Sequence, residues 1–303
     1  MLCPRHCGVN RTAGERGYCG ESATLRLASA GIHKGEEPPI TGTRGSGTIF
    51  VSGCNLGCTF CQNYQISHEA MGRAVDIPEF VAICLNLQNQ GAENINIVTG
   101  THAIPALVAG LKQARTEGLV IPTLWNSSAY ESLEALSLLN DVIDVYLPDL
   151  KTLDTNLAAR FFNAPDYPEY ATKAILRMLD TRTLKTAPNS TLTSGVIIRH
   201  LVLPGYLEAT RATLRWFAEQ CKGRALISIM TQYTPPKNTN TQLKDAPKHF
   251  MNKQEYETVL GWLEEFGIED GFYQELAPDS DWLPDFTRYN PFSSTLATAV
   301  WHC

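Results

Sequence analysis

The sequence predicts an α/β fold with a mostly parallel sheet, and two observations lead to this class. Strand-like apolar runs alternate with helix-like runs along the chain, at intervals that suit parallel βαβ units. None of the strand-like runs is followed by the glycine fingerprint of dinucleotide-binding folds. Six such units in order predict an incomplete (β/α)6 barrel, and a doubly wound open sheet is the structural alternative.

The first unit begins with Ile49–Val51, an apolar and partly β-branched run that predicts a buried strand. Its helix is expected to start at Asp76, a suitable N-cap with Pro78 in the first turn, and to end at Gly91. Five further strands are expected at Ile95–Val98, Ile121–Trp125, Val142–Leu147, Val196–Leu203 and Leu226–Met230. The helices between them are expected at Ile104–Ala114, Leu133–Leu139, parts of Asn156–Met178, and Leu207–Cys221.

Length and composition suit one barrel-sized domain, since the chain has 303 residues, of which 44% are hydrophobic. The barrel is expected at residues 46–235, after an N-terminal cysteine-bearing extension at 1–45. The remaining residues, 236–303, are expected to hold an amphipathic helix at Lys253–Phe266 and a capping tail that includes Gln274–Leu276 and Trp282–Phe286.

Charge and hydropathy disfavour several classes of function. The formal net charge is -6 and there is no basic tract, which argues against a long nucleic-acid footprint. No apolar run approaches the roughly 20 residues that cross a bilayer. The polar start Met1–His6 lacks the apolar core of a signal peptide, so the nine cysteines are expected to be reduced and the protein cytoplasmic.

Three cysteines, Cys54, Cys58 and Cys61, lie on a loop directly after the first strand. Three thiolates can hold a cubane iron-sulfur cluster while one iron keeps an open position for a substrate. The alternative is a zinc knuckle or a structural thiol cluster. Zinc would require a second Cys or His pair nearby, whereas Cys84 lies in a predicted helix and His68 has no partner histidine.

The spacing Cys-x3-Cys-x2-Cys, with the aromatic Phe60 before the last cysteine, resembles the cluster motif of the radical S-adenosylmethionine (SAM) superfamily. Gly35–Ile40, Gly45–Phe50 and Cys61–Tyr64 resemble an uncharacterised branch of pyruvate formate-lyase activating enzyme-like proteins. The resemblance covers nearly the whole chain. It implies a partial barrel of the radical SAM type, a [4Fe–4S] cluster on the three cysteines, and S-adenosyl-L-methionine as the second cofactor.

Residues at the strand ends are the expected cofactor ligands. Related activases carry a Gly-Gly-Glu segment after the second strand, which meets the methionine ammonium, whereas this chain shares only Gly100 in character. A hydroxyl of Thr99 or Thr101, or a backbone carbonyl, is therefore expected to take the ammonium. His102 either points to solvent from the start of a helix or takes part in catalysis.

Asn126, Asp149, Lys151 and Arg199 follow or occupy later strands and join Phe60 as expected cofactor-binding residues. Lys151 or Arg199 can pair with the methionine carboxylate, while Asp149 or Asn126 can hydrogen-bond the ribose hydroxyls. The alternative for Asp149 and Lys151 is a surface ion pair of little energetic value.

Strand alternation places Arg199 on the face opposite His200. In the resembling family this arginine points into the barrel, and His200 is expected to be a hydrogen-bonded core residue. After the sixth strand, Gln232 and Tyr233 are expected either to line the substrate mouth or to begin a turn.

A second cysteine set, Cys3, Cys7 and Cys19, lies in a glycine-containing segment with little apolar content. Such a segment suggests a second metal that organises it. In the resembling proteins another cysteine often precedes this set. Either the start of the chain is misassigned, or His6 or an exogenous ligand completes the site, or no metal binds.

The resemblance implies an enzyme that reductively cleaves SAM to a 5′-deoxyadenosyl radical, which abstracts hydrogen from a substrate. The favoured substrate is a glycyl residue on a partner glycyl radical enzyme, with flavodoxin or ferredoxin as electron donor. The alternatives are radical modification of a small molecule or RNA, or a non-catalytic iron-sulfur or zinc module that carries electrons. The number of β/α units favours an enzyme over an electron carrier.

Overall fold

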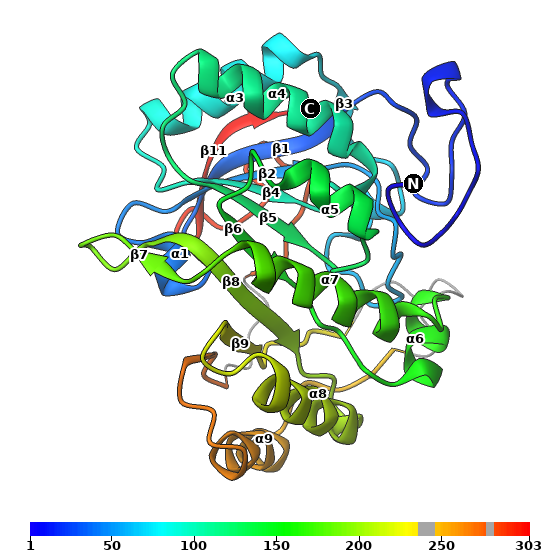
Figure 1. The fold of residues 1–303 in the computed structure, drawn as a ribbon, viewed down its shortest axis with the longest axis vertical. Helices are drawn as coiled ribbons and strands as arrows, with labels where there is room; N and C mark the ends of the chain where they lie inside the picture. The colour runs from blue at the N-terminus through cyan, green and yellow to red at the C-terminus, as the bar shows by residue number, and fades with distance from the viewer. Residues whose placement is uncertain (236–245, 277–281) are drawn as a thin grey trace.

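A computed structural model describes residues 1–235, 246–276 and 282–303 and shows one mixed sheet with helices packed around it (Figure 1). Across the sheet the strands are β10 (Gly271–Tyr273), β9 (Leu226–Met230), β8 (Leu192–Leu201), β6 (Val145–Pro148), β5 (Thr123–Ser127), β4 (Ile95–Val98), β2 (Ser46–Val51), β1 (Arg26–His33) and β11 (Ala297–His302). All neighbouring pairs from β10 to β2 are parallel. The two remaining pairs, β2 with β1 and β1 with β11, are antiparallel. Two short strands, β3 (Arg73–Ala74) and β7 (Lys185–Thr186), pair with β1 and β8.

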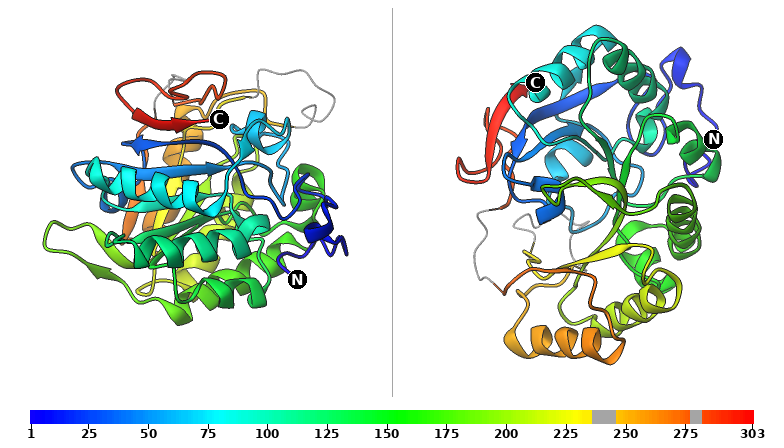
Figure 2. Two further views of the ribbon diagram at one scale, coloured as in Figure 1. Left: turned by 90° about the horizontal axis from the view of Figure 1, so that it is seen from above. Right: turned by 60° about the vertical axis from the view of Figure 1, so that its left-hand side comes forward.

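The long helices pack against the outer face of the curved sheet (Figure 2). The α-helices are α1 (Pro38–Thr41), α2 (Tyr64–Ser67), α3 (Ile77–Asn89), α4 (Ile104–Thr116), α5 (Leu133–Leu139), α6 (Thr155–Phe162), α7 (Tyr167–Thr181), α8 (Leu207–Gln220) and α9 (Lys253–Glu265). A doubly wound sheet carries helices on both faces, so that alternative is wrong. The sheet is open, because its edge strands β10 and β11 do not pair with each other among the described residues. The expected incomplete barrel is confirmed.

Local sequence signals explain why these helices begin and end where they do. Asp76 caps α3, since its carboxylate accepts a hydrogen bond of 2.8 Å from the Glu79 amide. The apolar face of α3 is buried against the sheet at Phe80, Ile83 and Leu87. None of the helices in the described parts of the chain combines the length and apolarity needed to cross a membrane.

Two predicted strand starts were early, and both differences have a local cause. The strand expected from Val142 begins at Val145, because the Val142 and Ile143 amides are used in a turn to the Leu139 carbonyl. The strand expected from Ile121 begins at Thr123, directly after Pro122. Five strands of the sheet were not expected from the sequence: β1, β3, β7, β10 and β11.

Candidate cofactor site

The loop at 53–63, here called the cluster loop, connects β2 to α2 and carries three unbridged cysteines, Cys54, Cys58 and Cys61. Its first turn requires glycine, because Gly53 has φ +83° and a Cβ there would lie 2.5 Å from Cγ of Glu21. The Thr59 amide donates to the Phe161 carbonyl at 2.9 Å, and Asn55 donates to the Tyr130 carbonyl at 2.7 Å. Contacts to distant elements therefore hold the loop in place.

The surroundings of the three sulfurs suit metal-bound thiolates. Burial raises the pKa of Cys58, while the nearby ammonium of Lys151 opposes this rise. Burial also raises the pKa of Cys61, whose sulfur accepts a hydrogen bond of 3.3 Å from the Ser67 hydroxyl. A bound metal offsets the cost of ionising buried thiols, so this donor set fits an iron-sulfur cluster.

Among residues 1–235, 246–276 and 282–303, no group of three or more His, Cys, Asp or Glu side chains has the arrangement to hold one metal ion. A cubane cluster is ligated through separate irons, so its cysteines need not converge on one point. This finding gives no support to a single metal ion either on the cluster loop or at Cys3, Cys7 and Cys19.

The predicted strand-end residues form one buried charge network. Asp149 accepts from Lys151 Nζ at 2.9 Å and from Arg199 Nε at 2.8 Å. Arg199 also pairs through Nη1 with Glu36 at 3.1 Å. Its Nη2 donates to the side-chain oxygen Oδ1 of Asn126 at 2.8 Å. The side chains of these charged residues are at most 17% exposed, so the surface ion-pair interpretation of Asp149 and Lys151 is wrong.

Charge compensation sets the protonation of this network. Burial alone would raise the pKa of Asp149, but the Arg199 guanidinium and the Lys151 ammonium hold it below its ordinary value. Burial alone would lower the pKa of Lys151, and Asp149 more than offsets this, so the pKa is raised. Burial raises the pKa of Glu36 against the opposing effect of Arg199. Glu37 is also close enough to act on Arg199, and burial raises its pKa as well, so two cations face three carboxylates.

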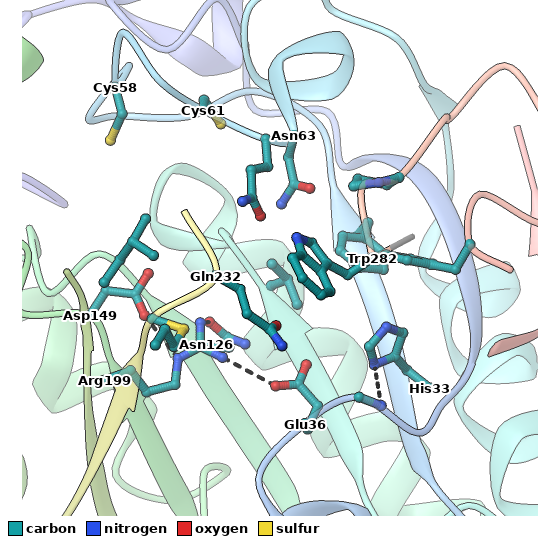
Figure 3. Close-up of a pocket in the computed structure, with 18 of the residues that line it drawn as sticks. His33, Glu36, Cys58, Cys61, Asn63, Asn126, Asp149, Arg199, Gln232 and Trp282 are labelled. Carbon is teal, nitrogen blue, oxygen red and sulfur yellow. Dashed lines mark hydrogen bonds and ion pairs between the residues drawn. The ribbon is translucent and has the colours of Figure 1, made fainter. Parts of the chain in front are cut away.

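The network lines a cavity of about 450 Å³ that also reaches the cluster loop. Figure 3 shows Cys58 and Cys61 at one end of this cavity and Glu36 with Arg199 at the other. The predicted residues Phe60, Asn126, Asp149, Lys151, Arg199, Cys58, Cys61 and Gln232 line it. The cavity is also lined by residues that the sequence did not predict as cofactor ligands: His33, Glu36, Gln62, Asn63, Gln274 and Trp282.

Phe60 is held by an aromatic cluster beneath the cavity. Its ring packs edge-on against Phe161 and Phe162, with centroids 5.6 and 6.0 Å away, and against Tyr233 at 6.1 Å. Tyr233 is buried and donates to the Pro247 carbonyl at 2.8 Å. Of the expected mouth residues, Gln232 therefore lines the cavity, and Tyr233 supports its wall.

Val98, the last residue of β4, lines the cavity, whereas the predicted residues Thr99 and Gly100 that follow it are not among the lining residues. Thr99 adopts a left-handed φ of 63°, which is uncommon for a β-branched residue, and its amide donates to the Asn126 carbonyl at 2.9 Å. Gly100 packs closely, since a Cβ would lie 2.6 Å from Leu107 and 2.7 Å from Trp125. Their contact with the methionine ammonium stays a prediction.

The two histidines singled out from the sequence are both buried. His102 is 4% exposed, so the expectation that it points to solvent is wrong, and its Nδ1 has no partner among the described residues. Burial lowers its pKa to about 4. His200 is a hydrogen-bonded core residue, as expected, with the Leu150 carbonyl at 2.7 Å and the Thr210 hydroxyl at 2.9 Å.

In the N-terminal segment, the cysteine sulfurs accept hydrogen bonds. Cys7 Sγ accepts from the Tyr18 amide at 3.3 Å, and Cys19 Sγ accepts from Arg11 Nη2 at 3.1 Å. Burial raises the pKa of Cys3, and neighbouring Cys19 and Cys7 add to this rise. The three thiols are therefore close enough to influence one another.

Comparisons with known proteins agree with this geometry. The Radical SAM superfamily profile matches residues 48–217, more than half of the chain. An uncharacterized protein of Methanocaldococcus jannaschii is 28% identical over 276 residues, which cover 88% of this chain and 75% of that protein.

Solved structures share the fold at low sequence identity. SuiB of Streptococcus suis bound to precursor peptide SuiA has a TM-score of 0.53 and 15% identity over 74% of this chain and 47% of SuiB. The SAM-bound form of SuiB has a TM-score of 0.52 and 14% identity over 74% of this chain and 48% of SuiB. The chain thus spans about half the length of SuiB. A domain of a pyruvate-formate lyase-activating enzyme from Bacteroides vulgatus ATCC 8482 has a TM-score of only 0.41 and 14% identity, over 57% of this chain and 91% of that domain. This similarity is too low to support membership of the activating-enzyme branch.

The family match covers the cluster loop, the sheet strands β4, β5, β6 and β8, and Asp149, Lys151 and Arg199. The chain belongs to the radical SAM superfamily.

Proposed function

We propose that the protein is a radical SAM enzyme whose Cys54, Cys58 and Cys61 hold a [4Fe–4S] cluster. The observation that carries this proposal is the buried cavity that joins Cys58 and Cys61 to the charge network of Asp149, Lys151 and Arg199. When bound, the cluster and SAM supply the one-electron chemistry that yields a 5′-deoxyadenosyl radical for hydrogen abstraction. The protein supplies binding, orientation and exclusion of water.

The charge network suits a zwitterionic ligand such as the methionine end of SAM. Arg199 and Lys151 can pair with its carboxylate, while Asp149 and Asn126 can bind ribose hydroxyls. Phe60 would lie against the cofactor, and Thr99 with Gly100 would meet the ammonium through backbone or hydroxyl oxygen. The ammonium and carboxylate of the methionine end cancel each other, so the sulfonium alone would add one positive charge to a cavity that the carboxylates of Asp149 and Glu36 line.

The uncharged polar lining of the cavity supports a neutral, amide-bearing substrate. Carboxamides of Gln62, Asn63, Gln232 and Gln274 line it together with the Trp282 indole. A carboxamide both donates and accepts hydrogen bonds, as a peptide backbone does. This supports hydrogen abstraction from a peptide, with a glycyl residue of a partner enzyme as the favoured target.

Radical modification of a small molecule is the second candidate, because C-terminal residues reach over the cavity. Trp282, Pro284, Phe292 and Leu296 all line it, which restricts entry of a bulky protein loop. RNA is disfavoured, since both cations that line the cavity in the described part of the chain are paired with carboxylates.

A second metal at Cys3, Cys7 and Cys19 is a separate proposal. The three cysteines are unbridged, and Cys7 and Cys19 lie near enough to Cys3 to act on its thiol. Triple replacement of these cysteines by Ala should lower iron or zinc content while the spectrum of the first cluster is unchanged. Unchanged metal content would contradict the proposal.

The main test is uncoupled SAM cleavage by anaerobically reconstituted protein. With dithionite and SAM, the wild type should release 5′-deoxyadenosine, and the Cys54, Cys58 and Cys61 triple Ala variant should lose both the cluster and the activity. Arg199→Ala should keep the cluster but weaken SAM binding by about 1–3 kcal/mol, through loss of a charge-assisted hydrogen bond. A full, reducible cluster that neither binds SAM nor releases 5′-deoxyadenosine would instead identify an electron carrier, and stoichiometric zinc without iron would identify a zinc module.

A further inference from the structure

Strand β1 contributes a histidine to the cavity of the charge network. His33, the last residue of β1, lines this cavity, although it lies outside residues 48–217 that the family profile matches. Its backbone pairs with Ser46 of β2 on one side and with Ala297 of β11 on the other. The sheet therefore holds His33 in a fixed position, in a part of the cavity that the profile does not describe.

Neighbouring groups fix the imidazole ring as well. The Gly35 amide donates to Nδ1 at 3.1 Å, a contact marked in Figure 3, and the Phe292 ring packs edge-on, with centroids 4.6 Å apart. Glycine is required for this approach, since a Cβ at Gly35 would lie 2.7 Å from Cε1 of His33. Burial lowers the pKa of His33 to about 4, so the ring is neutral at pH 7. Because Nδ1 accepts a hydrogen bond, the proton of the neutral ring is on Nε2.

One polar atom of this oriented ring, Nε2, is left to bind a ligand. In the described parts of the chain Nε2 has no hydrogen-bond partner, and protein atoms do not cover it completely. Figure 3 shows the imidazole pointing into the cavity. A donor that is already oriented loses little conformational entropy when it binds. His33 thus offers one uncharged N–H to the occupant of the cavity.

The charges around the cavity indicate which acceptor suits this donor. Two cations, Lys151 and Arg199, face three carboxylates, those of Asp149, Glu36 and Glu37. An anionic substrate would meet more carboxylates than cations, whereas the oxygen of a neutral carbonyl accepts the N–H and adds no charge. A peptide carbonyl has this chemistry, in agreement with the carboxamides that line the cavity.

We propose that His33 is a specificity-determining residue whose Nε2–H donates a hydrogen bond to a backbone carbonyl oxygen of a peptide substrate. SAM binding is left to the cluster loop and the charge network. This inference rests on the proposed function, because it assigns substrate recognition within the same cavity. It adds that recognition comes from β1, outside the part of the chain that the family profile matches.

The experiment measures peptide binding to the reconstituted, SAM-loaded protein without a reductant, so that no turnover occurs. The probe is the neutral peptide N-acetyl-alanyl-glycyl-alanine amide, and ligand-observed NMR titration gives its dissociation constant. The variants are His33→Phe, which keeps a ring but removes the donor, and His33→Gln, whose carboxamide restores a donor. The control is His249→Phe, the same change at an exposed residue that is not among the lining residues of the cavity.

His33→Phe should weaken peptide binding about three- to ten-fold, the usual range for one lost hydrogen bond between neutral groups. His33→Gln should recover most of this loss, and His249→Phe should bind the peptide like the wild type. Equal peptide binding by the wild type and His33→Phe, or no saturable binding by the wild type, would overturn the proposal. A loss of SAM affinity by the same factor in His33→Phe would assign His33 to the cofactor and overturn it too.

A second variant keeps the test decisive if His33→Phe fails to fold. Gly35 is exposed, and the Cβ added in Gly35→Ala would displace the His33 ring without removing its donor. We expect peptide affinity to fall in Gly35→Ala, and an affinity equal to that of the wild type would contradict the proposal. Failure of the proposed function has a different signature, because the wild type with dithionite and SAM would then release no 5′-deoxyadenosine, whatever the peptide titration shows.

Discussion

Among single residues, Asp149 is the group on which the charge balance of the cofactor site depends. Its two carboxylate oxygens are divided between Lys151 and Arg199, at 2.9 and 2.8 Å. Its backbone carbonyl also accepts a hydrogen bond from the buried Tyr167 hydroxyl at 2.7 Å. Loss of this carboxylate would leave two buried cations facing Glu36 and Glu37, whose pKa values burial raises.

We expect Asp149→Asn to lower the free energy of unfolding of the apo-protein by about 3 kcal/mol, because removing one partner leaves a buried charge uncompensated. Urea denaturation at neutral pH measures the effect. The matched control is Asp180→Asn, which breaks the exposed pair with Arg224 and should cost about 0.5 kcal/mol or less. Equal effects of the two substitutions would contradict a buried, mutually dependent network.

Sequence patterns predicted one half of this network and missed the other. Arg199 and Asp149 follow recognisable strands, so their convergence at one sheet edge was predictable. Glu36 follows β1, a strand rich in Ala, Ser and Gly whose small side chains give no clear alternation. Its 3.1 Å pairing with Arg199, 163 residues away in sequence, depends on tertiary structure that local patterns do not encode.

Among the elements, the N-terminal segment and the cluster loop act as one unit joined by Arg5. Its guanidinium donates to the Asn55 and Leu56 carbonyls, both at 2.9 Å, and to the Phe162 carbonyl at 2.7 Å. It also stacks on the Tyr18 ring, 3.8 Å from the centroid. One side chain therefore connects three segments around the cluster cysteines.

Replacement of Arg5 by Ala should loosen the cluster loop without removing a cysteine. We expect reconstituted Arg5→Ala to lose iron to a chelator about ten-fold faster than the wild type, as when a group that orients metal ligands is removed. The absorbance of the iron–chelator complex follows this loss over time. Arg16→Ala is the control, because Arg16 donates a hydrogen bond within its own segment, to the Gly20 carbonyl. Identical rates for all three proteins would show that the contacts of Arg5 do not stabilise the cluster loop.

The elements differ in how far the sequence determines them. α3 was predictable because Asp76 and Pro78 mark the start of the helix, and its apolar residues recur with helical periodicity. β11 was not, since its pairing with β1 brings together residues such as Ala30 and Trp301 from opposite ends of the chain. β10 has three residues, too few for a pattern.

Across the whole molecule, buried histidines from distant elements share one titration behaviour. His102 lies after β4 and His200 lies in β8, and they are 4% and 1% exposed. Burial lowers the pKa of each to about 4. Their ordinary value is about 6.5, so between these two limits the unfolded chain binds protons that the folded chain does not.

The sign of the resulting pH dependence follows from this difference. Stability from the neutral histidines is fully present above about pH 6.5 and is lost as the pH falls toward 4, by about 1.4 kcal/mol per pH unit for each histidine. Burial raises the pKa of Glu36 and Glu131, so these acids titrate in the opposite sense. The informative quantity is therefore the difference in slope between the wild type and a histidine variant.

We expect His200→Gln to reduce the slope of unfolding free energy against pH, between pH 6.5 and 4, by about 1.4 kcal/mol per pH unit. Glutamine retains a donor and an acceptor near the Leu150 carbonyl and the Thr210 hydroxyl, so the variant tests titration more than packing. Urea titrations of the apo-protein at several pH values give the slope. A His200→Gln slope equal to that of the wild type would mean that His200 takes up a proton as readily in the folded chain as in the unfolded one, against its burial.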